Sequence, residues 1–335
     1  MINPLTVLGF AGTVVTETYD EFGLLQPDKS VAALERRYST RRSKFVDVGD
    51  SRIHYAEEGA PENPTLLLIH GTYASLHTWN DWVDELVDEY HIVRLDMPGF
   101  GLTGPRPEGE LRFEYLIETI SDFADVLSLS DVTVVGNSLG GGVAWRLSVK
   151  RPDLVSRLVL VDAGGASLLA RLAGNLTSLG NGVIPRYVTP RLVIRLVLRD
   201  AYGDPSKVTP ELVRRYHDLL LRPGNRRSVI EIANNYAADY PVDEIDTVYD
   251  PNMFSLPSAY EPSPDILDGY DIEDVSVPTL FQWGNEDEWL SVPFGRRLAS
   301  RVPNSQFLVY EGVGHIPMEE SPVDTAQDVR EFLSS

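Results

Sequence analysis

The sequence predicts an α/β fold: a mostly parallel central sheet with helices on both faces and an inserted helical cap. Short apolar runs rich in Val, Ile and Leu alternate with longer stretches whose apolar residues recur at helical spacing. The apolar runs are nearly continuous, which is typical of parallel strands that are covered on both faces. The alternation is interrupted once, by residues 163–271, where arginine-rich helical stretches replace the strands.

The elements of the sheet follow one another from Lys44 onward. An antiparallel pair opens it, because two β-rich runs at 44–48 and 52–58 flank a Gly49-Asp50 turn. We expect the remaining strands at 65–70, 91–96, 131–137, 157–162, 278–283 and 305–310. We expect the connecting helices at 79–90, 113–130, 139–150 and 293–301, and a last helix from about Pro322.

This pattern divides the chain into three parts. Residues 1–43 are expected to form an N-terminal arm, and 44–162 together with 272–335 are expected to form the α/β core. Residues 163–271 are expected to form the cap. They contain helical stretches at 190–200, 209–221 and 226–236 and end in a long loop, 241–271, rich in Pro, Asp, Ser and Tyr.

The composition excludes several classes of chemistry. None of the 335 residues is cysteine, which excludes disulfides, iron–sulfur clusters, thiolate zinc sites and cysteine nucleophiles. The 29 basic and 50 acidic residues leave a net charge of −21, which argues against nucleic-acid binding because such a surface repels phosphate. Only four of the basic residues are lysine. This acidic, lysine-poor composition favours a halophilic protein, with an ordinary acidic protein from a GC-rich genome as the alternative.

The most apolar segment near the N-terminus, 5–15, is too short to cross a bilayer, which takes about 20 residues. No basic residue precedes it, as one would in a signal peptide, and the first one in the chain is Lys29. We therefore expect no stable membrane insertion and a cytoplasmic protein, with an interfacial anchor as the alternative. A homodimer is left open.

The strongest catalytic signal is Gly136-Asn137-Ser138-Leu139-Gly140, a G-x-S-x-G pattern between a buried strand and a helix. This spacing suits a nucleophile because the serine occupies a sharp turn and the glycines let strand and helix approach closely. The helix that starts here directs free amides and the positive end of its dipole to the place where an oxyanion would form. Ser138 is therefore our candidate nucleophile, with a glycine-rich structural turn as the alternative.

A serine nucleophile needs a base, and the base needs an acid that orients it. His315 follows the last expected strand, and Asp287 follows the strand at 278–283. Both fall at the carboxyl ends of strands, where open α/β sheets bind their ligands. We assign His315 as the base and Asp287 as the acid, so that the chain order is Ser, Asp, His. Asp162, which ends the strand at 157–162, is the alternative acid.

With these residues in place, the chain resembles the α/β-hydrolase family over residues 44–335. Five ordered blocks carry the resemblance: His70-Gly71-Thr72 with Ser75 and Trp79, Asp96-Met97-Pro98-Gly99-Phe100-Gly101, GNSLGG, GNED and GVGHIPMEE. The resemblance implies the α/β-hydrolase fold and an oxyanion hole made by the backbone N–H groups of Thr72 and Leu139. It also implies a structural role for His70 and a cap, 163–271, over the active site.

Two other patterns point to cofactors but lack the context that they need. Residues 99–104 match the dinucleotide fingerprint G-x-G-x-x-G, but Pro105 follows at once, where the fingerprint requires a helix. His70 and His77 show no carboxylate spacing typical of a metal site. We expect neither a cofactor nor a metal, and we expect a small acyl compound as the partner.

The sequence thus predicts a serine hydrolase that cleaves a small ester or related acyl compound through an acyl-enzyme. Ser138 argues against haloalkane dehalogenases and epoxide hydrolases, which need an aspartate at this place. GNSLGG and the segment 204–224 are similar to C–C bond hydrolases of meta-cleavage products, although Ile316 stands where those enzymes usually carry tryptophan. That group, a cofactor-free perhydrolase and a non-catalytic ligand-binding protein on the same scaffold are the alternatives.

Overall fold

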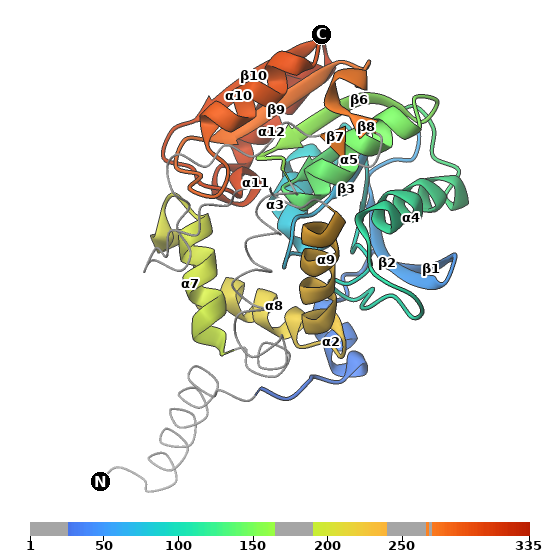
Figure 1. Cartoon of the computed structure of the whole chain (residues 1–335), viewed down its shortest axis with the longest axis vertical. Coiled ribbons are helices and arrows are strands. Elements are labelled where there is room, and N and C mark those ends of the chain that lie inside the picture. The colour runs from blue at the N-terminus through green and yellow to red at the C-terminus, as the bar shows by residue number, and fades with distance from the viewer. Residues whose placement is uncertain (1–25, 165–189, 240–265, 268–269) are drawn as a thin grey trace, which may run out of the picture.

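The computed structural model describes residues 26–164, 190–239, 266–267 and 270–335. The described residues form an eight-stranded sheet with helices on both sides (Figure 1), as the sequence predicts. The strands of this sheet are β1 (Ser43–Val48), β2 (Ser51–Glu58), β3 (Thr65–Ile69), β4 (His91–Leu95), β5 (Val132–Asn137), β6 (Val155–Val161), β9 (Thr279–Gly284) and β10 (Ser305–Tyr310).

The sheet is antiparallel where it begins and parallel elsewhere. Its strand order is β1-β2-β4-β3-β5-β6-β9-β10, with β1–β2 and β2–β4 antiparallel and each later pair parallel. Val48 and Ser51 lie opposite each other at the end of the first hairpin, and Gly49 in the turn has a φ of +56°. Glycine adopts such a positive φ without steric cost, which explains the turn that the sequence predicts there.

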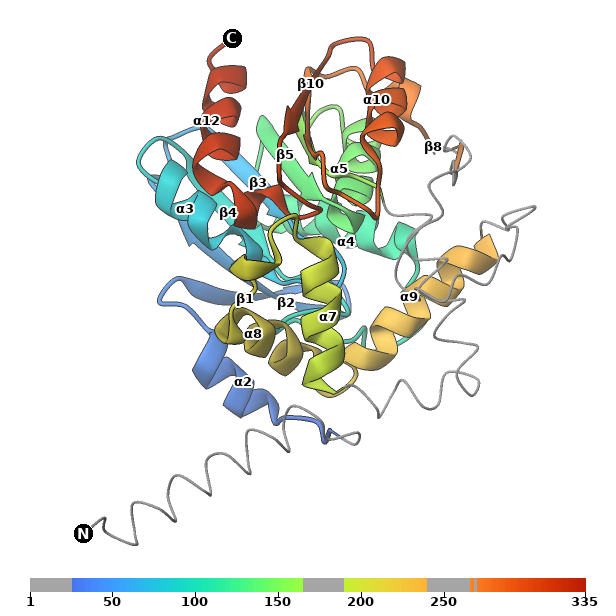
Figure 2. The ribbon, with the colours of Figure 1, turned by 90° about the vertical axis from the view of Figure 1, so that its left-hand side faces the viewer.

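Helices cover both faces of the sheet (Figure 2). Those of the core are α3 (Asn80–Leu86), α4 (Phe113–Val126), α5 (Leu139–Lys150), α10 (Val292–Arg301), α11 (Pro317–Glu320) and α12 (Pro322–Leu333). α3 packs against α12 on one face, while α4 packs against α5 on the other. Short 3₁₀ turns occur at η1 (Leu76–Trp79), η2 (Pro205–Lys207) and η3 (Ile272–Asp274). The helix expected at 79–90 is shorter in the structure, because Trp79 belongs to η1 and α3 ends at Leu86.

The middle strands form the core between the two layers of helices. Leu66, Leu67, Leu68 and Ile69 of β3 are fully buried, and so are the apolar residues of β5 and the end of β6. Removing one such side chain from water stabilises the fold by roughly 1.5–3 kcal/mol. The continuous apolar runs in the sequence therefore reflect strands that are covered on both faces, as predicted.

Between β6 and β9 the chain forms α7 (Arg191–Ala201), α8 (Pro210–Leu220) and α9 (Asn225–Asp239), which lie together at one edge of the sheet (Figure 2). The three helical stretches expected in this insert are therefore present. Another helix, α2 (Val31–Tyr38), lies in the segment that we expected to be only an arm. Lys29 Nζ and the Tyr38 hydroxyl attach it to α8, donating to the Asp218 carboxylate at 2.6 and 2.8 Å.

Parts of the arm and the insert lie outside the described residues, namely 1–25, 165–189, 240–265 and 268–269. The apolar segment 5–15 and most of the expected loop 241–271 fall there, so the predictions about them stay predictions. Two short strands at the end of that loop, β7 (Ile266–Leu267) and β8 (Tyr270–Asp271), are not predicted by the sequence. Within the described residues, no helix is long and apolar enough to span a membrane.

Candidate active site

Ser138 lies in the turn between β5 and α5, at the carboxyl edge of the sheet. Its φ of 52° and ψ of −119° form a conformation that residues with a side chain rarely adopt. The Ser138 N–H donates to the Val161 carbonyl of β6 at 3.1 Å, and the Ser138 carbonyl accepts from Gly142 at 3.1 Å and Gly164 at 3.2 Å. These bonds hold the turn in its strained shape, and such strain is typical of functional sites.

Gly136 and Gly140 allow β5 and α5 to come this close. A Cβ atom on Gly136 would lie 2.3 Å from the carbonyl oxygen of Gly140. A Cβ atom on Gly140 would lie 2.3 Å from the carbonyl oxygen of Ile69 on β3. Both glycines of the G-x-S-x-G pattern are therefore required by the close approach of backbone to backbone.

His315 and Asp287 form a hydrogen-bonded pair. His315 follows β10 and Asp287 follows β9, and His315 Nδ1 lies 2.7 Å from Asp287 Oδ2. The other carboxylate oxygen, Asp287 Oδ1, accepts the N–H of Trp289 at 2.8 Å and that of Leu290 at 2.9 Å. Both side chains of the pair are almost completely buried. The structure thus brings the candidate base and acid together and fixes the orientation of the imidazole.

Ser138 and His315 line the same cavity. The second ring nitrogen of His315, Nε2, is buried and has no hydrogen-bond partner among the described residues. This nitrogen is available to accept a proton from a hydroxyl in the cavity. Bonds between a catalytic base and its nucleophile are often long in free enzymes and shorten when substrate binds.

Asp162, the alternative acid, lies beside this pair. It follows β6, is completely buried and has a positive φ of 40°. Its Oδ1 accepts the N–H of Gly284 at 3.1 Å. Within the described residues, the carboxylate bonded to the imidazole is that of Asp287. The geometry therefore favours Asp287 as the acid that orients His315.

Two backbone N–H groups near Ser138 have no acceptor among the described residues. Leu139 is the first residue of α5, where the N–H has no partner within the helix. Thr72 lies in the loop after β3 and lines the cavity together with Ser138. Within the described part of the chain, neither N–H donates a hydrogen bond. These are the two amides that the resemblance implies as an oxyanion hole.

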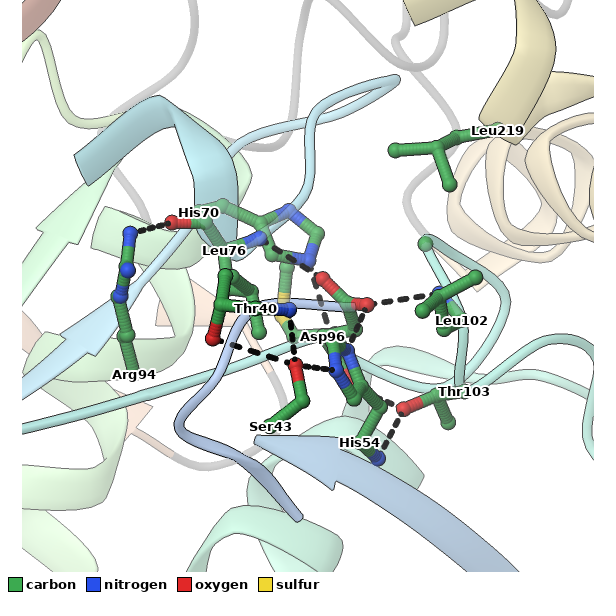
Figure 3. Close-up of polar contacts among 12 residues, drawn as sticks. Thr40, Ser43, His54, His70, Leu76, Arg94, Asp96, Leu102, Thr103 and Leu219 are labelled. Atoms are coloured by element: carbon green, nitrogen blue, oxygen red, sulfur yellow. Dashed lines mark hydrogen bonds and ion pairs between the residues drawn. The ribbon is translucent and has the colours of Figure 1, made fainter. Parts of the chain in front are cut away.

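A buried carboxylate anchors the segment that follows Thr72 (Figure 3). Asp96, which follows β4, accepts the N–H of Leu76 through Oδ1 and that of Leu102 through Oδ2, both at 2.7 Å. His54 Nδ1 on β2 lies 2.7 Å from the same Oδ2. Burial acts to raise the pKa of Asp96, but the charge and hydrogen bond of His54 outweigh burial and lower this pKa to about 2.

His70 has a structural partner at each ring nitrogen. Nδ1 lies 2.7 Å from the Gly71 carbonyl oxygen, and Nε2 accepts the N–H of Met97 at 3.0 Å. Burial lowers the pKa of His70, and Nε2 carries no proton because it accepts a hydrogen bond. These contacts agree with the structural role that the resemblance implies and leave no nitrogen for proton transfer.

Helices α7 and α8 supply the far wall of the cavity. The apolar residues that line it are Ala74, Ile194, Val197, Leu198, Ala201, Trp289 and Ile316. Tyr73 and Tyr216 add phenol rings, and burial raises the pKa of Tyr73 to about 12. Among the described residues, neither arginine nor lysine lines the cavity, which measures about 30 Å³. The described lining of the cavity is therefore mostly apolar.

Three residues that the sequence analysis did not single out support His315. The Asn137 side-chain amide donates to the His315 carbonyl at 3.1 Å, and the Trp289 ring lies 4.8 Å from the imidazole, centroid to centroid. Glu320 Oε1 accepts the N–H of Gly314 at 2.6 Å. Asn137 lies in the block GNSLGG, Glu320 lies in GVGHIPMEE, and Trp289 lies two residues after GNED. That position was the signal that could have found them.

Known proteins resemble this chain over most of its length. The sequence profile described as the alpha/beta hydrolase fold matches residues 64–322. A 2-hydroxy-6-oxononadienedioate/2-hydroxy-6-oxononatrienedioate hydrolase of Cupriavidus pinatubonensis is 27% identical over 305 residues, or 88% of this chain and 96% of the relative.

Two solved structures share the fold at low sequence identity. A meta-cleavage product hydrolase from Pseudomonas fluorescens has a TM-score of 0.68 at 23% identity, covering 87% of this chain and 97% of its own. A thermophilic esterase from Thermogutta terrifontis has a TM-score of 0.64 at 20% identity, covering 87% of this chain and 98% of its own.

The matched region, 64–322, contains Ser138, Asp287 and His315. It starts just before β3 and reaches the first residue of α12, so it includes the whole parallel part of the sheet. The chain belongs to the α/β-hydrolase fold family.

Proposed function

We propose that this protein is a serine hydrolase that cleaves a small, uncharged ester through an acyl-enzyme. The observation that carries the proposal is the buried pair of His315 and Asp287. His315 lines one cavity with Ser138, and its Nε2 has no hydrogen-bond partner among the described residues. A base oriented by a carboxylate and adjacent to a serine in a strained turn is the arrangement that activates a serine hydroxyl.

Each step of the reaction has a group to perform it. His315 Nε2 takes the hydroxyl proton as Ser138 Oγ attacks the ester carbonyl, and Asp287 stabilises the imidazolium that forms. The N–H groups of Thr72 and Leu139 bind the oxyanion. His315 then gives the proton to the leaving alcohol, and the same base activates the water that releases the acid from Ser138.

The walls of the cavity support an uncharged acyl group. Aliphatic side chains of α7 and the ring of Trp289 surround the space next to Ser138, and no cation lines it among the described residues. A carboxylate placed there would lose its hydration without gaining a partner, which is costly. The cavity of about 30 Å³ next to Ser138 supports a short acyl group rather than a long one.

Hydrolysis of a C–C bond is a second candidate. The 27% identity to a 2-hydroxy-6-oxononadienedioate hydrolase favours it. The substrate in that name carries two carboxylates, however, and the described lining of the cavity offers no arginine or lysine to bind them. Turnover of p-nitrophenyl acetate without turnover of a dienone dicarboxylate supports the ester, and the reverse result supports C–C cleavage.

Replacing Ser138 by alanine tests the proposal. Because the variant lacks the attacking oxygen, we expect ester turnover to fall by about 10⁴-fold or more with the fold intact. A fluorophosphonate probe should label the wild type and leave Ser138→Ala unlabelled. Ser300→Ala, an exposed change on α10, should retain both activity and labelling. Equal labelling of Ser138→Ala contradicts the assignment, and a wild type that neither reacts nor turns over is a binding protein instead.

A further inference from the structure

Asp162 is buried next to Asp287, and the mechanism above leaves it without a role. One polar atom each from Asp162, Asp287 and His315 lie within 4.8 Å of one another. The parallel pairing of β6 and β9 creates this proximity, because Val161 lies opposite Gln282 and both acids follow at the same edge of the sheet. Two buried carboxyl groups thus lie side by side.

The two oxygens of the Asp162 carboxyl have different surroundings. Oδ1 accepts the N–H of Gly284, whereas Oδ2 is buried and receives no donor from the described residues. The carboxyl group of Asp287 is the neighbouring acid, because a polar atom of each aspartate lies within 4.8 Å of the other. Two carboxylates are both acceptors, so a hydrogen bond between them requires a proton on one of the two.

The donors around each acid indicate where that proton resides. From the described part of the chain, Asp287 accepts two backbone N–H groups and the N–H of the His315 ring, while Asp162 accepts one backbone N–H. The acid with fewer donors is the poorer anion and keeps the proton. Burial, followed by the charge and hydrogen bond of Asp287, raises the pKa of Asp162 well above that of an ordinary aspartate. The charge of Glu320 of α11, which is also an acid, acts on the pKa of Asp162 in the same direction.

We propose that Asp162 is a protonated positioning residue whose Oδ2–H donates a hydrogen bond to the carboxylate of Asp287. The proposal rests on the role assigned to Asp287 above. The additional donor holds the Asp287 carboxylate in the orientation in which it bonds to His315 Nδ1, so the imidazole keeps the position that it needs as the base for Ser138. Because the protonated Asp162 is neutral, it adds no second negative charge beside His315.

Asp162→Asn and Asp162→Ala distinguish positioning from packing. Asparagine tolerates a positive φ, has the same shape and can donate to Asp287, so we expect its turnover to stay within roughly tenfold of the wild type. Alanine removes the donor, and we expect kcat to fall by roughly 10- to 100-fold, the loss typical of a hydrogen bond to a charged group. KM should change little in both variants, because Asp162 does not line the cavity.

The pH profile shows whether Asp162 is neutral. If it is, Asp162→Asn replaces one neutral group by another, and the acid limb of kcat/KM stays where it is in the wild type. If Asp162 is ionised, the same variant removes a negative charge next to His315, and the acid limb moves to lower pH. Such a shift overturns the proposal.

Infrared spectroscopy of the free protein tests the proton without any assay of activity. At neutral pH the wild type should show the deuterium-sensitive carbonyl band of a protonated carboxyl group. The band should be missing in Asp162→Asn and present in Asp122→Asn, an exposed change on α4. If Asp162→Asn does not fold, Asp162→Ala takes its place in the comparison.

A wild type without the carbonyl band overturns the proposal. If the band is present but Ser138→Ala keeps its activity, the error lies in the proposed function and not in the protonation of Asp162.

Discussion

Asp287 and Asp162 show how the surroundings of a single carboxyl group decide its chemistry. Both are buried aspartates at the carboxyl edge of one sheet, a few ångströms apart. Among the described residues Asp287 accepts three donors and Asp162 accepts one, which is why we assign the charge to Asp287 and the proton to Asp162. Two neighbouring acids with divergent proton affinities are a common arrangement where an active site must keep one of them ionised.

Asp287→Asn should abolish most of the activity. Asparagine can present an N–H instead of an acceptor to His315 Nδ1, which favours the wrong tautomer of the imidazole, and we expect turnover to fall by about 10⁴-fold. Steady-state ester hydrolysis at neutral pH measures the effect, with the melting temperature as a control for folding. If Asp287→Asn stays active and Asp162→Asn is the crippling change, the two acids have been assigned the wrong way round.

Asp96 should make the stability of the protein depend on acid pH. Its folded-state pKa of about 2 lies below the ordinary 3.8, so it stabilises the fold above about pH 4 and loses this effect as pH falls through 2. We expect Asp96→Asn to lower the free energy of unfolding by at least about 2 kcal/mol at neutral pH. Chemical denaturation between pH 7 and about 2 checks it.

Asp47→Asn, an exposed change on β1, is the matched control for Asp96→Asn and should match the wild type throughout. The stability gap between wild type and Asp96→Asn should narrow between about pH 4 and pH 2. A gap that stays constant down to the lowest pH shows that Asp96 acts through its shape and not through its charge.

Among the elements of the fold, α7 contacts both the substrate cavity and the loop that carries the base. Ile194, Val197 and Leu198 line the cavity. The backbone carbonyl of Ala201, at the end of the helix, accepts the backbone N–H of His315 at 2.7 Å. Glu320 of α11 strengthens this connection. Its carboxylate accepts the backbone N–H groups of Gly203 and Asp204, which follow α7, and also that of Gly314, which precedes His315. A displacement of α7 therefore affects substrate binding and the position of His315 together.

Shortening a side chain on the inner face of α7 should change the preference for acyl length. Ile194→Ala enlarges the cavity, so kcat/KM for butyrate and hexanoate esters should rise relative to acetate. The lost packing should also cost about 2–5 kcal/mol of stability, as is typical of such core substitutions. A series of p-nitrophenyl esters measures the preference.

Leu196→Ala is the matched control for Ile194→Ala, because Leu196 lies on the same helix and is 46% exposed. This variant should keep the wild-type order of acyl preference. If both variants shift the preference equally, the effect comes from loosening of α7 and not from the room next to Ser138.

The charge of the whole molecule is a property of the surface and not of the active site. The net charge of −21, with only four lysines among 29 basic residues, places many carboxylates near one another. Repulsion among them destabilises the compact state in dilute buffer. Salt weakens this repulsion, because the Debye length falls from about 10 Å at 0.1 M to about 3 Å at 1 M.

Melting temperature and activity should both rise between 0.1 and 2 M KCl, because the Debye length shortens over this range of salt concentration and the repulsion weakens. Thermal melts and ester turnover along a KCl series measure the response. At low salt, NaCl at equal ionic strength should act like KCl, whereas sulfate adds a hydrophobic contribution of its own. A flat or falling melting temperature shows an ordinary acidic protein whose arginine content has another origin.

The sequence by itself determined the local parts of this protein. The parallel strands could be located because burial on both faces leaves continuous apolar runs, and Ser138 could be located because a tight strand–helix turn demands glycine at fixed spacing. His315 and Asp287 could be ranked as candidates because each follows a strand of the same sheet. All of these signals lie within a few residues of the position that they identify.

Only the tertiary structure decided how distant groups meet. It bonds His315 to Asp287 and leaves Asp162 beside them with one donor. It also makes His54 the partner of Asp96 and α7 the wall of the cavity. These outcomes depend on strand register and on packing between segments that lie far apart along the chain. A slip of one residue in the register of a strand would turn its side chains to the opposite face of the sheet. No local pattern in the sequence records such distances, because they arise only when the strands pair.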